Sequence, residues 1–373
     1  MKNNNKLVII FSGYNQRAII SFMRTLEKNA ISYTIIARSA HDPILKTCYK
    51  RHVSVIRTSE DLDPATIVNY IEDIKQTFKA TQYLLAPSTE ALNRLLVHER
   101  DRFSNLGVEV PLVNETLYCA VSDKKSFSQL CKNKGILIPD EYSSISKARL
   151  PFVAKPVQYQ AQDGKISPPV LISSDEEKQA FIDSYDVNHF YYQKLVSGKS
   201  FYLLYYFHRN GQVYKFSQEN LIQQPEGKSM IACRAANIHT QSESSQYEQL
   251  FHELNFFGLV MIEIISNETG HYMIEANPRF WGPSQLFVDA DMNFFEALLH
   301  DYHMIKKAPV FSTDKKQQLY FWYDGVKETL SQNKILTRYD KENNNIIEHL
   351  DKWLEHDVYN RNDTAEIFNE ETQ

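Results

Sequence analysis

The chain has 373 residues, which exceeds the usual size of one hydrophobic core and predicts two or three domains. Hydrophobic residues make up 43% and charged residues 23%, as is typical of a soluble globular protein. The net charge is −5 and the basic residues form no long run, so the charge gives no indication of nucleic-acid binding.

The start of the chain and its cysteines predict a cytoplasmic protein. The first apolar run, Leu7 to Phe11, is too short for the core of a signal peptide and far too short to span a membrane. The cysteines form no CxxC pair and no metal-ligand cluster. We expect them to be buried thiols in a reducing compartment: Cys48, Cys119, Cys131 and Cys233.

Strand and helix patterns alternate in the N-terminal part of the chain. The expected strands are 6–12, 33–37, 52–56 and 83–86, and the expected helices are 18–27, 64–78 and 89–99. This alternation predicts a doubly wound parallel sheet, whose ligands bind beyond the carboxyl ends of the strands. The fingerprint GxGxxG is absent, so no dinucleotide site is expected. Residues 12–17 are either an ordinary turn or a substrate-binding segment.

The middle of the chain mixes helices with strands that are joined by short turns. A linker over 111–121 is expected to lead to a helix at 123–134 with Ser122 as its N-cap. The next expected strands are 150–157, 170–173, 191–196, 200–208 and 213–218, and the helices are 175–185 and 246–256. Lys155 lies inside an apolar strand. It either extends from an edge strand into water or binds a phosphate group.

Two apolar runs around the turn signal NETG predict a β-hairpin over residues 258–282. With the loop centred on Thr269, Glu263 and Glu275 lie directly opposite one another. Four side chains would then point into the core: Ile262, Ile264, Ile274 and Ala276. Like charges across a ladder repel, so the pair is either exposed to solvent or holds a divalent cation between its members.

At this hairpin the sequence resembles the ATP-grasp superfamily, in the branch of the carbamoyl-phosphate-synthase subunits and amino-acid ligases. The family pattern of one glutamate followed by Glu-x-Asn-Pro-Arg on the next strand is similar to Glu263 and then residues 275–279. The lysines of Ser122-Asp123-Lys124 and of the run PFVAKP (Lys155) resemble the two ATP lysines of the family. Further similar segments are the adenine hinge, 192–196, and Gly-x-Ser, 227–229.

The resemblance covers the chain from Lys6 to about Tyr302 and implies an α/β and α+β fold. An N-terminal parallel doubly wound (pre-ATP-grasp) domain is followed by a two-lobed ATP-grasp fold. The expected units are the N-terminal domain (1–115), the small lobe with its linker helix (116–190), the large lobe (191–305) and a C-terminal extension that packs on the large lobe (306–373).

The resemblance also implies a role for individual residues. Mg²⁺, with Mn²⁺ as an alternative, is expected on Glu263, Glu275 and Asn277. The catalytic residues are expected to be Arg279 and Lys155. ATP is expected to contact Lys124, Lys155, Lys165, Gln193, Lys194, Leu195 and Val196.

The implied activity is an ATP-dependent ligase that joins a small-molecule carboxylate to an amine, or to a related nucleophile, through an acyl phosphate. A homodimer is common among members of this family, and no nucleic-acid or membrane partner is expected. The sequence departs from the family at residues 158–165, where a glycine-rich phosphate loop is replaced by a segment with one glycine. Lys165 either makes a side-chain contact there or belongs to a surface turn. A non-catalytic nucleotide-binding regulatory or scaffold protein and an ATP-grasp kinase are therefore the alternatives.

Overall fold

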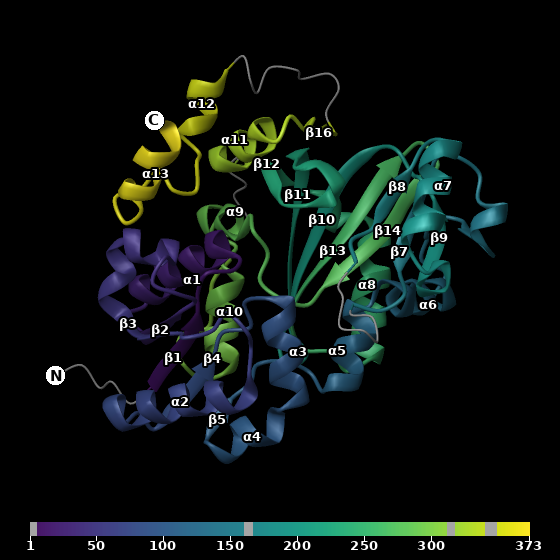
Figure 1. Ribbon diagram of the computed structural model, residues 1–373. Helices are drawn as coiled ribbons and strands as arrows, with labels where there is room; N and C mark the ends of the chain where they lie inside the picture. Colours follow the sequence, from purple (N-terminus) through teal and green to yellow (C-terminus); the bar gives the residue numbers. More distant parts are fainter. Residues whose placement is uncertain (1–5, 160–166, 312–317, 340–348) are drawn as a thin grey trace.

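A computed structural model describes residues 6–159, 167–311, 318–339 and 349–373. Its strands form three sheets, one in the N-terminal part of the chain and two in the rest of the chain (Figure 1). In the described part of the chain, no helix is both long enough and apolar enough to cross a membrane.

The N-terminal sheet is parallel and has the strand order β3-β2-β1-β4-β5. Its strands are β1 (Lys6–Phe11), β2 (Ser32–Ala37), β3 (Val53–Ile56), β4 (Gln82–Leu85) and β5 (Val108–Glu109). Its helices are α1 (Gln16–Lys28), α2 (Pro64–Phe78), α3 (Glu90–His98), α4 (Arg100–Asn105) and α5 (Glu115–Ser122). Apolar side chains on both faces of β1 are buried in two separate clusters, which confirms the predicted doubly wound sheet.

Helix α5 corrects the expected linker over 111–121. Asn114 caps this helix, because its side chain accepts a hydrogen bond from the backbone N–H of Leu117. The following helix, α6 (Lys124–Asn133), begins after Asp123, so Ser122 ends α5 and is not the N-cap of α6. Lys124 therefore occupies the first position of α6.

The second sheet is antiparallel, has four strands and forms the small lobe of the fold. Its strand order is β6-β9-β7-β8. The strands are β6 (Glu141–Tyr142), β7 (Phe152–Pro156), β8 (Val170–Ile172) and β9 (Phe190–Lys194), and α7 (Asp175–Ser184) packs against β8. Phe152, Ala154 and Phe181 belong to the core of this lobe.

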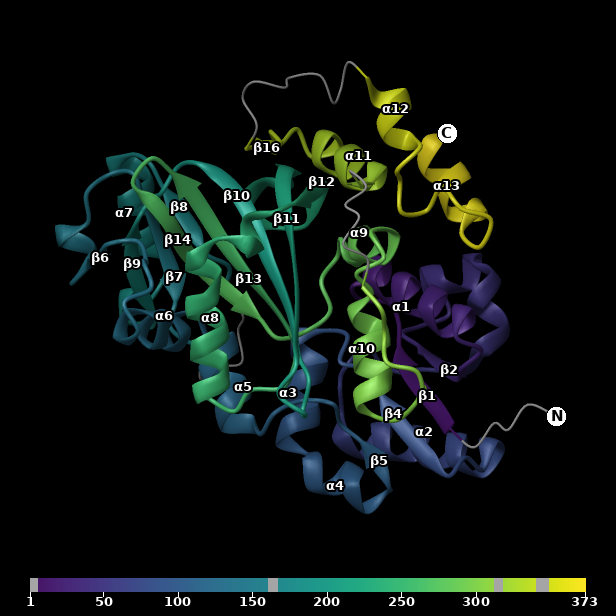
Figure 2. The same ribbon diagram turned by 180° about the vertical axis from the view of Figure 1, so that it is seen from behind.

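The third sheet is antiparallel and follows the order β14-β13-β10-β11-β12-β15, with β16 paired to β11. Its strands are β10 (Lys199–Phe207), β11 (Val213–Gln223), β12 (Met230–Ala236), β13 (Gly258–Asn267), β14 (Gly270–Asn277), β15 (Leu319–Phe321) and β16 (Thr337–Arg338). Strand β12 was not predicted. Helix α8 (Ser242–Glu253) lies against one face of this sheet, and α9 (Ser284–Asp289) and α10 (Phe294–Asp301) lie between the large sheet and the N-terminal sheet (Figure 2).

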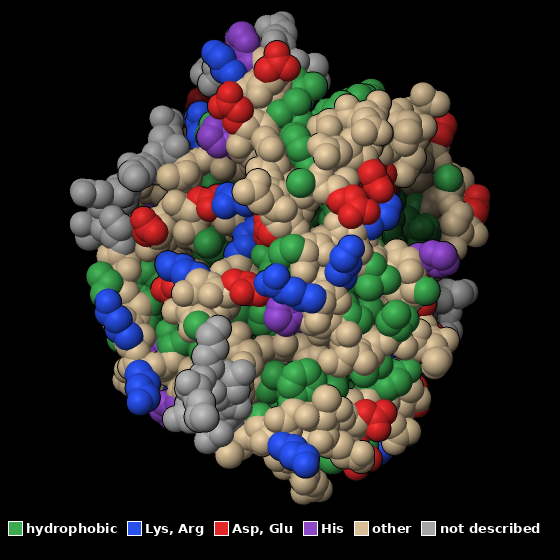
Figure 3. All heavy atoms as spheres, turned by 90° about the vertical axis from the view of Figure 1, so that its left-hand side faces the viewer, with side chains coloured by type: hydrophobic (Ala, Val, Ile, Leu, Met, Phe, Trp, Pro, Cys, Tyr) green, Lys and Arg blue, Asp and Glu red, His purple; other side chains and the backbone are tan. Residues whose placement is uncertain are grey.

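The C-terminal segment contacts both the large sheet and the N-terminal domain. It contains α11 (Tyr323–Ser331), α12 (Leu350–Leu354) and α13 (Ala365–Thr372). Strands β15 and β16 join the large sheet, whereas α13 lies beside α1 and the 3-10 helix Pro43–Lys46 (Figure 1). On the face that carries the N-terminal domain and these helices, acidic and basic side chains are interspersed (Figure 3). The division of the chain into four units stays a prediction.

Candidate nucleotide and metal site

A cleft of about 1810 Å³ lies between the small lobe and the large sheet. Strands β7 and β9 line one side, and the β13–β14 hairpin lines the other. The predicted site residues that line this cleft are Lys124, Lys155, Gln193, Lys194, Leu195, Val196, Glu263, Glu275, Asn277 and Arg279. The remaining predicted residue, Lys165, lies outside the described residues.

Glu263 and Glu275 are directly opposite each other in the ladder of β13 and β14, as predicted. The turn itself is one residue tighter than expected, because Asn267 pairs with Gly270. A bulge at Ile274 then shifts the register and restores the predicted pairing. The bulge also corrects one orientation, since Ile274 lines the cleft and is absent from the core.

Two lysines bring positive charge to this carboxylate pair. The ammonium group of Lys124 forms an ion pair with Glu275, and the Lys155 ammonium donates to the carbonyl of Ile274 at 3.1 Å. Burial lowers the pKa of Lys124 to about 8, although the charge of Glu263 opposes this effect. Burial and the nearby Lys124 charge lower the pKa of Lys155 to about 7. The bulge thus supplies a backbone acceptor for a buried lysine.

Glu263 is the more buried member of the pair, with 8% of its surface exposed. Burial raises the pKa of its carboxyl group, and the charges of Lys124 and Lys155 offset part of the increase. A buried carboxylate of this kind is stabilised by additional positive charge. The geometry therefore favours cation binding over an exposed, solvated pair of glutamates.

A chain of polar contacts leads from Glu275 to the N-terminal domain. Asn277 Nδ2 donates to Glu275 Oε1 at 2.7 Å, and Arg279 Nη2 donates to Asn277 Oδ1 at 3.0 Å. Arg279 Nε lies 3.8 Å from Oε2 of Glu90, the first residue of α3. Arg279 thus lies between the carboxylate pair and the N-terminal domain.

The donor set of the hairpin fits a magnesium ion. Mg²⁺ is bound through one or two protein carboxylates, with phosphate oxygens and water completing its shell. Glu263 and Glu275 provide two carboxylates, and Asn277 provides an amide oxygen. Among the described residues, no three His, Cys, Asp or Glu side chains gather closely enough to hold a metal ion. A cation here would therefore need ligands beyond protein carboxylates, as phosphate oxygens provide.

The end of β9 also lines the cleft. The side chain of Gln193 is buried, with 1% of its surface exposed, and its Nε2 donates to Oε1 of Glu141 at 3.4 Å. The backbone N–H of Lys194 donates to the carbonyl of Asp140 at 2.8 Å. Leu195 and Val196 follow the strand and line the cleft. The expected strand 191–196 thus ends two residues earlier, at Lys194, and the residues after it face the cleft.

Glu90 follows β4 of the N-terminal sheet, at the edge where ligands were expected to bind, and it lines the cleft. Other cleft residues were not predicted from the sequence: Tyr159 follows β7, and residues 337–339 come from the C-terminal segment. Tyr339 donates its hydroxyl to Gln223 Oε1 at 2.6 Å. A single aromatic residue outside any motif gives no signal in the sequence, so these contacts could not be predicted locally.

The segment 12–17, which the sequence left open as a turn or a substrate-binding segment, makes contacts outside the cleft. The Ser12 hydroxyl donates to Asp42 at 2.6 Å, and Arg17 donates to the carbonyl of Met230 at 2.9 Å. Two polar residues after β11 are also held by protein contacts: Arg234 forms an ion pair with Glu219 at 2.7 Å, and Nδ1 of the buried His239 lies 2.7 Å from Ser217 Oγ. The described lining of the cleft includes none of these four residues.

Residues 121–283 match the model of the ATP-grasp domain family. The chain therefore contains an ATP-grasp domain, and its N-terminal parallel sheet and antiparallel sheets have the arrangement typical of that fold. No curated protein matches the chain in sequence.

Solved structures share the fold over most of the chain. N5-carboxyaminoimidazole synthetase from Staphylococcus aureus has a TM-score of 0.63 and 13% identity, covering 89% of this chain and 86% of its own. The biotin carboxylase domain of Hydrogenobacter thermophilus 2-oxoglutarate carboxylase, a dimer in complex with MgADP, ADP and bicarbonate, has a TM-score of 0.62 and 13% identity, covering 87% and 76%. Pyruvate carboxylase from Rhizobium etli has a TM-score of 0.62 and 14% identity. The match covers 85% of this chain but only 31% of that protein.

Proposed function

We propose that the protein is an ATP-dependent carboxylate–amine ligase that works through an acyl phosphate. A related nucleophile can take the place of the amine. The observation that carries the proposal is the opposed pair Glu263 and Glu275, which shares one cleft with the cations Lys124, Lys155 and Arg279. This combination suits a reaction in which negative charge moves between phosphate oxygens.

In the proposed reaction, a carboxylate oxygen of the substrate attacks the γ-phosphorus of ATP, and ADP leaves. The amine nitrogen then attacks the acyl carbon, the bond from this carbon to the phosphate oxygen breaks, and the amine loses a proton. Lys124 and Lys155 hold the phosphates as point charges. Arg279 offers a planar fork of donors to acyl-phosphate oxygens. Mg²⁺ on Glu263, Glu275 and Asn277 supplies neutralisation of phosphate charge when it is bound.

The adenine of ATP is proposed to lie at the end of β9. Backbone groups of the segment Gln193 to Val196 would read the edge of the ring, and apolar side chains such as Leu195 and Val196 would cover its faces. Lys165 is proposed as a further ATP contact. A homodimer is proposed by analogy with the dimeric biotin carboxylase domain of Hydrogenobacter thermophilus. The proposed partners are a small carboxylate and an amine.

The test is a screen for ADP release from Mg-ATP with pairs of candidate acids and amines, including amino acids and sugar acids. A productive pair should stimulate ADP and phosphate release, and Glu275→Ala should abolish the stimulation. If no pair stimulates turnover while the protein binds Mg-ATP tightly, the ligase proposal fails and the non-catalytic regulatory or scaffold function takes its place. The single glycine of segment 158–165 is the observation that favours this alternative.

An ATP-grasp kinase is distinguished by its product. A ligase releases free phosphate and leaves none on its product, whereas a kinase leaves the phosphoryl group attached to its acceptor. Phosphorus-31 NMR of the reaction mixture separates the two outcomes. A product resonance that persists in place of free phosphate would contradict the ligase.

A further inference from the structure

Arg94 lies on α3 of the N-terminal domain, and its side chain contacts four residues that line the cleft. Nε donates to Glu90 Oε1 at 2.8 Å. Nη2 donates to Ser122 Oγ at 2.8 Å and to Asp123 Oδ1 at 2.7 Å. The guanidinium carbon lies 4.6 Å from the centroid of the Tyr159 ring. Arg94 itself is absent from the described lining of the cleft, so it acts from behind these residues.

Two polar partners of Arg94, Glu90 and Asp123, lead to proposed phosphate-binding residues. Glu90 holds its second oxygen, Oε2, 3.8 Å from Arg279 Nε. Asp123 directly precedes Lys124, whose ammonium group reaches Glu275. One guanidinium group therefore connects the elements that carry Arg279 and Lys124, although these two residues come from opposite ends of the matched family domain.

Tyr159 gives this cluster a third connection. It lies four residues after Lys155, just beyond the end of β7. Its ring faces the Arg94 cation, an arrangement that is attractive when the cation is partly desolvated. Only 22% of the Arg94 side chain is exposed. The chain that leaves β7 is thus held against α3 of the N-terminal domain.

We propose that Arg94 is a positioning residue for the phosphate side of the cleft, holding Glu90, Asp123 and Tyr159 so that Arg279 and Lys124 face the nucleotide. This inference rests on the proposed ATP-dependent function. It makes the N-terminal domain part of the nucleotide site through a side chain that does not itself contact the ligand. Lysine cannot replace arginine here, because a single ammonium group cannot contact two carboxylates and a ring in fixed directions.

The test measures binding of Mg-AMPPNP and of adenosine by calorimetry, because adenosine lacks the phosphates that Arg279 and Lys124 would hold. Arg94→Ala and Arg94→Lys should each weaken Mg-AMPPNP binding by about tenfold or more, the scale seen for groups that orient ligating residues. Adenosine binding should stay within about twofold of the wild type. A merely structural role would weaken both ligands together and would be relieved by the lysine variant.

Arg100→Ala is the matched control. Arg100 lies in the same domain and donates to the backbone carbonyls of Val110, Leu112 and Val113, away from the cleft. It should destabilise the fold without the selective loss of Mg-AMPPNP binding. Unchanged Mg-AMPPNP binding in Arg94→Ala overturns the inference and leaves the proposed function standing. Wild-type protein that binds no Mg-AMPPNP overturns both.

Tyr159→Phe and Tyr159→Leu provide a second measurement that does not remove a charge. The phenylalanine keeps a ring against Arg94 and should bind Mg-AMPPNP like the wild type. The leucine removes the ring and should weaken binding by about threefold to tenfold, the equivalent of a partly desolvated cation–π contact. Equal binding by the two variants contradicts a role for the Arg94–Tyr159 contact.

Discussion

Glu263 and Glu275 lie directly opposite each other on strands β13 and β14, with the Lys124 ammonium group against Glu275. A divalent cation is expected to relieve the repulsion of the pair. In Glu275→Gln, Mg²⁺ should therefore lose its effect on nucleotide binding. Calorimetry with AMPPNP should show a gain in affinity on adding Mg²⁺ in the wild type, and this gain should fall by at least about tenfold in the variant.

Glu253→Gln is the control for this experiment. Glu253 is an acidic residue at the end of α8 that pairs with Lys134 outside the cleft. It should keep the full effect of Mg²⁺. If Glu275→Gln also kept it, the hairpin would not be the metal site.

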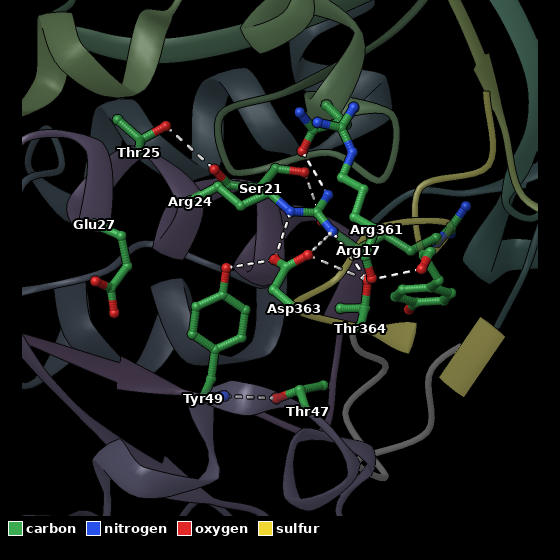
Figure 4. Close-up of polar contacts among 12 residues, drawn as sticks. Arg17, Ser21, Arg24, Thr25, Glu27, Thr47, Tyr49, Arg361, Asp363 and Thr364 are labelled. Carbon is green, nitrogen blue, oxygen red and sulfur yellow. Dashed lines mark hydrogen bonds and ion pairs between the residues drawn. The ribbon is translucent and has the colours of Figure 1, made fainter. Parts of the chain in front are cut away.

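Asp363 ties the C-terminal segment to the N-terminal domain (Figure 4). Its carboxylate accepts from Arg24 Nε at 2.8 Å, from Arg24 Nη2 at 3.0 Å and from the Tyr49 hydroxyl at 2.6 Å. Asp363→Asn loses one acceptor and leaves Arg24 with a neutral partner. Urea unfolding should show a loss of about 2 kcal/mol, since hydrogen bonds to charged groups in partly buried sites contribute on this scale.

The exposed pair Lys46 and Glu370 also joins the C-terminal segment to the N-terminal domain and serves as the comparison. Exposed ion pairs contribute little because water screens them. Glu370→Gln should therefore unfold at the same urea concentration as the wild type. An equal loss of unfolding free energy in both variants would mean that the Asp363 contacts stabilise the fold no more than an exposed ion pair does.

Gly13 and Gly211 form a matched pair for testing a close contact at the end of β1. Their φ angles are nearly equal, +87° and +89°, so alanine at either position is strained in the same way. At Gly13 the added methyl group would come within 2.2 Å of the Arg38 Cβ, whereas at Gly211 nothing lies within 4 Å. Gly13→Ala should therefore cost about 1–3 kcal/mol more than Gly211→Ala in urea unfolding. Equal losses would show that the segment around Gly13 can move away.

Glu371 on α13 makes stability depend on pH. Burial, together with the nearby carboxylates of Asp357 and Asp324, raises the pKa of Glu371 from 4.5 to about 9, despite the opposing charges of Arg17 and Lys327. The folded state therefore holds a proton that the unfolded state has lost between these two values, so stability falls as the pH rises through this range.

Glu371→Gln removes this dependence, because the amide is neutral at every pH. Thermal unfolding at about pH 8 should show a higher midpoint for the variant than for the wild type, and the difference should shrink towards about pH 5. A variant that is less stable than the wild type at both pH values would contradict the raised pKa.

Parts of the fold and of the cleft could be predicted because their residues carry local signals. The expected helix 64–78 begins with a proline, which favours the first helical position, and α2 spans Pro64–Phe78. Side chains alternate along a strand, which predicts that Glu275 and Asn277 share one face of the hairpin with Glu263. The structure has the predicted pairing of Glu263 with Glu275. The predicted register holds only because the bulge at Ile274 compensates for the tighter turn. No local feature of the sequence marks that bulge.

The rest depends on contacts between distant parts of the chain. The apolar residues of the short helix α5 follow the helical period too weakly to distinguish it from a linker. Its capping residue Asn114 is of a type that is also common in turns. Tyr339 reaches the cleft by pairing with β11, from 116 residues beyond its partner Gln223. Arg94 contacts Asp123 only once the N-terminal domain packs against the start of α6. Propensity and period carry no information on such encounters.

Arg24 is synthesised 339 residues before Asp363, the carboxylate that it binds. At ordinary rates of translation this interval is on the order of tens of seconds. During that time Arg24 has no carboxylate partner from the C-terminal segment. Arg24 can therefore pair with Asp363 only after the segment that precedes α13 has been synthesised, so the C-terminal segment joins the N-terminal domain late in synthesis.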